Sequence, residues 1–195
     1  KYDWLVLAIS VMIASTMPSN PRIVLFGPQL TQLQWTTERL CRLQSDLQNI
    51  SRLAFLRRCL AQLPAFIASL PLSQNDVLSQ LETLAGLAGN ETPDLTTLTS
   101  NVQLVPLTVV SHMVEWLSIT TSDMVAQGFC VGFLSAAVAA TTTQQDFEHY
   151  AANAIRIATC IGLIIDAEDA SHASADRVTA ISVRCQSHSH RAILE

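Results

Sequence analysis

One five-residue stretch of the sequence could form a catalytic centre: the run from Gly128 to Gly132, with the letters GFCVG. Three apolar residues, 124–126, precede it, and a run of small residues typical of a helix follows it as far as residue 140. Strand, sharp turn and helix in this order form a nucleophile elbow, whose apex residue adopts a strained backbone conformation. Glycines two positions on either side let the neighbouring backbone pass without Cβ clashes. The pattern therefore predicts Cys130 as a nucleophile.

The elbow normally carries serine, and cysteine at its apex brings thiol chemistry. The helix that follows directs its free N–H groups and its positive dipole end at Cys130, which favours negative charge there, as a thiolate or as an adjacent oxyanion. The alternative interpretation of Cys130 is a buried structural cysteine in a glycine-flanked turn.

The composition limits the classes of protein to which the chain could belong. Its 195 residues suffice for one domain, or for one domain and the start of a second. Apolar residues make up 49% of the chain, and the mean hydropathy is +0.32, which indicates a membrane or secretory segment or a surface covered by further chain. The net charge of −5, with a single lysine and no basic stripe, argues against a nucleic-acid partner.

The cysteines indicate the redox environment. Their number is odd, their spacing is wide, and they form no Cys-x-x-Cys pair: Cys41, Cys59, Cys130, Cys160 and Cys185. This usage suits a reducing compartment, so we expect a cytoplasmic location. Cys185 with His188 and His190 matches no zinc pattern and is interpreted as part of a polar loop, so no metal is expected.

The N-terminal residues 1–16 contain an apolar run, WLVLAISVMIA, which is about half the length needed to span a bilayer. We interpret these residues as upstream sequence or a processing artefact ahead of Met17. A signal or anchor and a buried element are the alternatives. No membrane partner is expected.

Before the elbow, the pattern predicts a buried strand ended by Gly27-Pro28, followed by several helices. The expected elements are a strand over 22–26, one long or two shorter helices over 30–60, a helical turn over 63–70, a helix over 75–87, a loop over 91–101 and a helix over 105–119. His112, in the last of these, is expected to make an ordinary hydrogen bond, with a supporting role in a site as the alternative.

After the elbow, the pattern predicts two helices, a loop and a new strand. The expected elements are helices over 131–140 and 144–165, an acidic loop over 166–176 and a strand over 178–183. Arg156 is the lone cation of the second helix and is expected at the surface, with the cleft behind Cys130 as the alternative. This order predicts an α/β fold with parallel strands and crossover helices.

Two motifs at this separation resemble one family. Leu25-Phe26-Gly27-Pro28-Gln29 after the first strand, together with the elbow, resembles the starter-unit acyl-carrier-protein transacylase domain at the N-terminus of fungal non-reducing polyketide synthases. The segments 154–158 and 178–184 are also similar to that family. The resemblance runs from Pro21 to the end of the chain.

The resemblance implies a fold class and a domain organisation. The family has a malonyl-acyltransferase-like α/β-hydrolase core, a parallel sheet with flanking helices, into which a ferredoxin-like subdomain is inserted. Transferred to this chain, residues 17–177 would form a partial acyltransferase core, and residues 178–195 would begin the small inserted subdomain.

The resemblance also implies an activity. The family takes an acyl group from acyl-coenzyme A or an acyl-carrier protein and passes it to the phosphopantetheinyl carrier protein of the polyketide synthase, without a bound cofactor. Cys130 would form the acyl-enzyme, the backbone N–H groups of Gln29 and Val131 would bind the oxyanion, and Gly128 and Gly132 would shape the elbow. Arg156 would contact substrate if the acyl group carried a carboxylate. The partners would be the carrier protein and the remaining domains of the synthase.

One departure from the family pattern leaves other functions open. The family's catalytic histidine lies downstream of the inserted subdomain, and none of the five histidines here occupies that motif, so we expect the chain to be the first half of a domain. One alternative is a non-catalytic remnant or carrier-protein docking module. The other is a cysteine-nucleophile α/β-hydrolase that draws on Asp166, Asp169 and His172.

Overall fold

The computed structural model describes residues 22–70, 81–89, 91, 94–119, 124–141 and 143–171. Several predictions fall wholly or partly outside these residues: the nature of residues 1–16, the first half of the helix over 75–87, part of the loop over 91–101, the end of the acidic loop over 166–176, the strand over 178–183 with the inserted subdomain, and the loop around Cys185.

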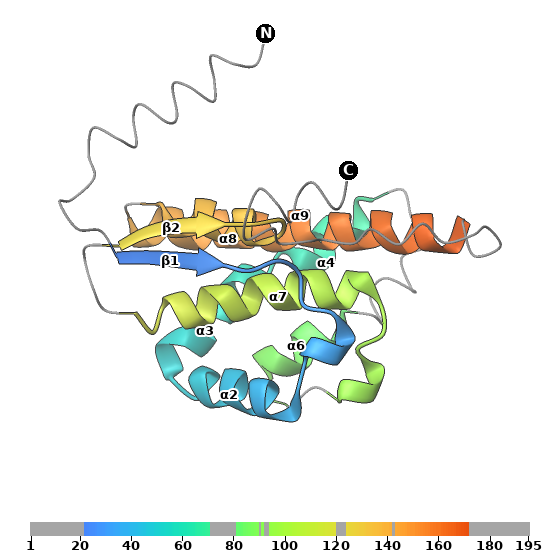
Figure 1. Cartoon of the computed structure of the whole chain (residues 1–195), viewed down its shortest axis with the longest axis horizontal. Coiled ribbons are helices and arrows are strands. Elements are labelled where there is room, and N and C mark those ends of the chain that lie inside the picture. The colour runs from blue at the N-terminus through green and yellow to red at the C-terminus, as the bar shows by residue number, and fades with distance from the viewer. Residues whose placement is uncertain are drawn as a thin grey trace, which may run out of the picture.

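The described residues form a mostly helical α/β structure with a two-stranded parallel sheet (Figure 1). In chain order, the elements are β1 (Arg22–Phe26), η1 (Gln32–Gln34), α2 (Thr37–Leu47), α3 (Ile50–Leu60), α4 (Leu63–Ala68), α6 (Glu82–Ala88), η2 (Leu95–Thr97), α7 (Asn101–Trp116), β2 (Met124–Gly128), α8 (Gly132–Ala139) and α9 (Gln144–Ser171). The helical turn predicted after residue 63 is α4.

The two strands pair in parallel, as the sequence predicts. Arg22 lies opposite Met124, and the register continues to Phe26 opposite Gly128. Because parallel strands end at the same edge of a sheet, the loop after β1 and the turn after β2 leave the sheet side by side. This edge brings the two motifs of the sequence together.

Helix α7 is the central element of the core. Every residue from Val102 to Val114 is buried, as expected for a helix that is apolar on all faces. Figure 1 shows α7 running between the strand pair and α2, and it also packs against α6, α8 and α9.

The structure corrects the predicted start of α7, which lies at Asn101 and not at residue 105. Ser100 and Gln103 form a capping box: the Gln103 Oε1 atom accepts the Ser100 N–H at 3.3 Å. Pro106 lies inside the helix, and not at its first turn. Since proline lacks an N–H, only one intrahelical hydrogen bond is lost at this position.

Helix α9 is longer than predicted, because it continues through the expected loop to Ser171. The carboxylate of Asp166 accepts the backbone N–H groups of Asn101 and Val102, both at 2.9 Å, and so caps the start of α7. One turn earlier, a Cβ atom on Gly162 would overlap the carbonyl group of Asn101, so glycine permits this close approach. The contact with α7 accounts for the helical conformation of the acidic segment.

Helix α9 is also the one described helix whose length and hydropathy, over Asp146–Ser171, would suffice to cross a membrane. Its buried residues Ala151, Ala154, Ile155 and Ala158 belong to the same apolar cluster as α7. A third of the apolar window is buried in the described structure.

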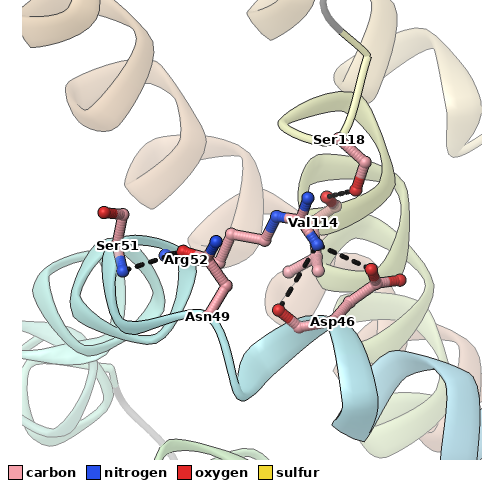
Figure 2. Close-up of polar contacts among 6 residues, drawn as sticks. All are labelled: Asp46, Asn49, Ser51, Arg52, Val114 and Ser118. Atoms are coloured by element: carbon pink, nitrogen blue, oxygen red, sulfur yellow. Dashed lines mark hydrogen bonds and ion pairs between the residues drawn. The ribbon is translucent and has the colours of Figure 1, made fainter.

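Helices α2 and α3 are separate, which resolves the choice between one long helix and two. Asn49 caps α3, since its Oδ1 atom accepts the N–H of Ser51 at 3.0 Å. Arg52 reaches back to the end of α2 and pairs with Asp46 at 2.6 Å (Figure 2). This pair lies close to the end of α7, just beyond which Ser118 donates to the carbonyl group of Val114. The turn therefore has its own polar contacts beside the core helix.

We expect Asp166→Ala to lower the free energy of unfolding by about 2 kcal/mol, because it leaves two N–H groups at the start of α7 without their acceptor. Urea denaturation measures the change. Asp169→Ala is the matched control: Asp169 lies in the same helix and is exposed, so its removal should cost less than about 0.5 kcal/mol. Equal effects of the two substitutions would contradict this role of Asp166.

Candidate active site

The backbone at Cys130 has the conformation of a nucleophile elbow. Its φ angle is +56°, and among the described residues it is the one non-glycine residue with positive φ. It lies between the end of β2 at Gly128 and the start of α8 at Gly132, and it is exposed. A left-handed conformation costs an L-residue about 1–2 kcal/mol, so the surrounding structure must hold this residue in place.

The two glycines of the elbow make room for backbone-to-backbone contact. A Cβ atom on Gly128 would overlap the carbonyl group of Gly132, and a Cβ atom on Gly132 would overlap the carbonyl groups of Phe26 and Gly27. The N–H of Phe129 also donates to the Phe26 carbonyl oxygen at 3.1 Å. The first turn of α8 therefore lies directly against the end of β1.

This contact brings the loop after β1 to the elbow. Among the described residues, no acceptor is found for the backbone N–H of Gln29 or for that of Val131, which precedes the first residue of α8. The next N–H of the loop, that of Leu30, donates to Thr108 Oγ1 at 3.2 Å. The two N–H groups predicted to bind an oxyanion, those of Gln29 and Val131, thus lie next to the contact between α8 and β1. Neither has an acceptor among the described residues.

His112 lies behind the elbow and supports α8. Its Nδ1 atom is 3.0 Å from the Oγ atom of Ser135, a buried residue one turn into α8. Its ring also packs on Phe26, with centroids 5.3 Å apart. Burial, together with the positive charge of Arg39, lowers the pKa of His112 to about 4, so the ring is neutral near pH 7. The expected ordinary hydrogen bond is therefore present, to a partner that the sequence did not indicate.

Arg156 is directed away from the elbow. Its guanidinium group donates to Gln62 Oε1 at 2.5 Å and to Asn153 Oδ1 at 3.2 Å, and it lies 5.8 Å from the ring centroid of Phe66. Asn153 belongs to α9, Gln62 to the segment that joins α3 and α4, and Phe66 to α4. The structure does not bring Arg156 to the residues around Cys130.

One residue that bonds to the loop after β1, Asn101, was not among the candidates that the sequence indicated. The Nε2 atom of Gln29 donates to Asn101 Oδ1 at 2.8 Å, and the Nδ2 atom of Asn101 donates to Asp166 Oδ1 at 2.8 Å. The signal for Asn101 was its place just after Ser100 in the capping box. Asp169 is exposed, and His172 lies outside the described residues.

The fold and the turn define an α/β protein with a cysteine in the left-handed conformation at the apex of an elbow between a strand and a helix. A family model described as "Starter unit:ACP transacylase in aflatoxin biosynthesis" matches residues 24–195. The chain belongs to this family, the starter unit:ACP transacylase domains.

Curated relatives agree with this assignment. The chain is 33% identical to the non-reducing polyketide synthase adrD of Penicillium rubens, over 86% of this chain and 7% of the relative. It is 30% identical to mapC of Penicillium brevicompactum (89% and 8%) and 31% identical to spyA of Aspergillus fumigatus (84% and 10%), both also non-reducing polyketide synthases. The chain spans a tenth or less of the length of these relatives.

The glycines of the elbow allow a direct test of its packing. Gly132→Ala should lower the free energy of unfolding by about 3 kcal/mol, because the added methyl group meets backbone atoms that cannot rotate away. Gly27→Ala is the matched control, since an added Cβ there meets no atom within 4 Å. Urea denaturation of both variants decides the matter, and an unchanged Gly132→Ala variant would exclude the close contact.

The buried His112 predicts a pH dependence of stability. From about pH 6.5 down to pH 5, the unfolded chain takes up a proton at His112 that the folded chain does not, so stability falls by about 2 kcal/mol as the pH falls. Denaturation at the two pH values should show a smaller loss for His112→Gln than for the wild type. His149→Gln, at an exposed position, should keep the wild-type loss. Identical losses in all three proteins would contradict this prediction.

Proposed function

We propose that this chain is the part of a starter-unit acyltransferase domain that carries the nucleophile, and that Cys130 holds the acyl group during transfer. The observation that carries the proposal is the strained, exposed thiol at the apex of the elbow, within a chain of the starter unit:ACP transacylase family. We also propose that the complete domain has the α/β-hydrolase-like core with an inserted subdomain, and that it acts in the cytoplasm.

The reaction consists of two thioester exchanges. In the first, the Cys130 thiolate attacks the carbonyl carbon of an acyl thioester, the C–S bond to coenzyme A or a donor carrier protein breaks, and the leaving thiolate takes up a proton. In the second, the phosphopantetheine thiol of the acceptor carrier protein loses a proton and attacks the acyl-cysteine, which releases the Cys130 thiolate. Thiols suit both steps because the attacking and leaving groups have similar basicity.

Each step passes through a tetrahedral oxyanion. The N–H groups of Gln29 and Val131 are free to donate to it, and donors that are already in place need no reorganisation when charge develops. The start of α8, just after Cys130, adds its dipole. These features favour an acyl-transfer reaction over a structural role for Cys130.

His112 is poorly suited to act as the general base for Cys130. The ring of His112 is engaged with Ser135, and its lowered pKa of about 4 makes it a weak base. Cys130 would thus accept acyl groups slowly in this chain alone.

The hydrolase alternative fits the geometry less well. Asp166, its candidate acid, directs both carboxylate oxygens at the start of α7. The docking alternative is supported by the large apolar side chains exposed beside the elbow, Phe129 at 63% and Phe133 at 67%. A chain that only docked a carrier protein would form no acyl-enzyme.

The test is intact-protein mass spectrometry after incubation with octanoyl-coenzyme A. The wild-type chain should gain one acyl group and Cys130→Ala none, because no other thiol in the described part of the chain has the elbow geometry. Burial raises the pKa of Cys59 to about 12 and also raises that of Cys160, which disfavours their thiolates.

Cys41→Ala is the matched control, since Cys41 is exposed and free like Cys130 but lies in a regular helix. It should acquire the acyl group as the wild type does. A folded wild-type chain that remains unmodified would favour the docking alternative.

A further inference from the structure

A chain of hydrogen bonds joins the loop after β1 to α9 through the first residue of α7. Gln29 Nε2 donates to Asn101 Oδ1, and Asn101 Nδ2 donates to Asp166 Oδ1, each at 2.8 Å. Asp166 also accepts the backbone N–H groups of Asn101 and Val102. Three segments far apart in sequence therefore share one polar network.

The chemistry of the groups fixes which atom donates and which accepts in each of these hydrogen bonds. An ionised carboxylate can only accept hydrogen bonds, so Asn101 must turn its NH₂ group toward Asp166 and its carbonyl oxygen toward Gln29. Gln29 must then present its NH₂ group to Asn101. Each amide has one orientation that satisfies its neighbour, so Asp166 determines how the Gln29 side chain is held.

A second contact holds the loop on the other side of Gln29. The N–H of Leu30 donates to Thr108 Oγ1 at 3.2 Å, and the Thr108 hydroxyl donates to the carbonyl oxygen of Leu104 at 2.8 Å. Thr108 is fully buried in α7. The side chain of Gln29 and the peptide that follows it are thus both anchored to α7, while the N–H of Gln29 itself has no acceptor among the described residues.

We propose that Asn101 and Asp166 are positioning residues for acyl transfer at Cys130, because they fix the loop that presents the Gln29 N–H to the oxyanion. This inference rests on the proposed function. Neither residue touches the reacting atoms. They act by preventing the loop from moving when negative charge develops, which is the condition for a preorganised donor to be effective.

The test compares two reactions of the same thiol in the full chain. Acylation by octanoyl-coenzyme A, followed by intact mass, passes through an oxyanion, whereas alkylation by iodoacetamide displaces iodide at carbon and forms none. Asn101→Ala should slow acylation at saturating octanoyl-coenzyme A about tenfold. Removal of an oxyanion donor lowers the rate of acyl transfer by about 10²–10³-fold, and a displaced donor should cause part of that loss. The half-saturating concentration and the rate of alkylation should stay at their wild-type values.

Asn153→Ala is the matched control, because Asn153 bonds to Arg156 and His149 and not to the loop. It should acylate at the wild-type rate. If Asn101→Ala does not fold, Gln29→Ala decides by the same two reactions, since it removes the side chain that bonds to Asn101 while leaving the backbone N–H of residue 29 in the chain.

The rates of acylation and alkylation together distinguish the positioning role from the proposed function. Slower acylation with unchanged alkylation supports the positioning role. Acylation at the wild-type rate overturns that role while leaving the proposed function intact. Equal slowing of both reactions overturns it as well, because the defect then lies in the thiol or its access. A wild-type chain that alkylates at Cys130 but does not acylate refutes the proposed function, and this inference with it.

Discussion

The site depends on one contact, in which the first turn of α8 lies with its backbone against the carbonyl groups at the end of β1. Only glycine at position 132 allows it, since a side chain there would overlap Phe26 and Gly27. The contact fixes the position of Cys130 relative to the start of the loop after β1. The strained conformation of Cys130 persists because the strand and the helix on either side are both fixed.

Helix α7 connects this contact to the rest of the molecule. Along its length it supplies Asn101 and Thr108 to the loop after β1, and His112 to the helix after the elbow. Because the helix is buried from Val102 to Val114, Thr108 and His112 make their hydrogen bonds in a medium of low dielectric constant, where satisfied hydrogen bonds are strong and orientation is well defined. The same helix thus forms the core and holds both halves of the site.

The local patterns of the sequence predicted the two strands, the elbow turn and most helices, because periodicity and glycine spacing determine these features. The contacts that extend across the fold were not predictable. Helix α9 runs past the expected end because Asp166 meets the start of α7, and Arg156 contacts Gln62, 94 residues away in sequence. Such contacts depend on which helices lie side by side, information that a single sequence does not contain.

The parallel pairing of β1 with β2 has a consequence for the order in which the chain acquires its structure. Arg22 and Met124 are neighbours in the sheet but about a hundred residues apart in sequence, and closing so long a loop costs about 4 kcal/mol of chain entropy. Helices α2 to α7 form from near neighbours and provide the surface on which the late strand can dock. On a ribosome, these helices would therefore emerge before the thiol is synthesised, and the site would form only when β2 and the turn after it dock on a helical layer that is already in place.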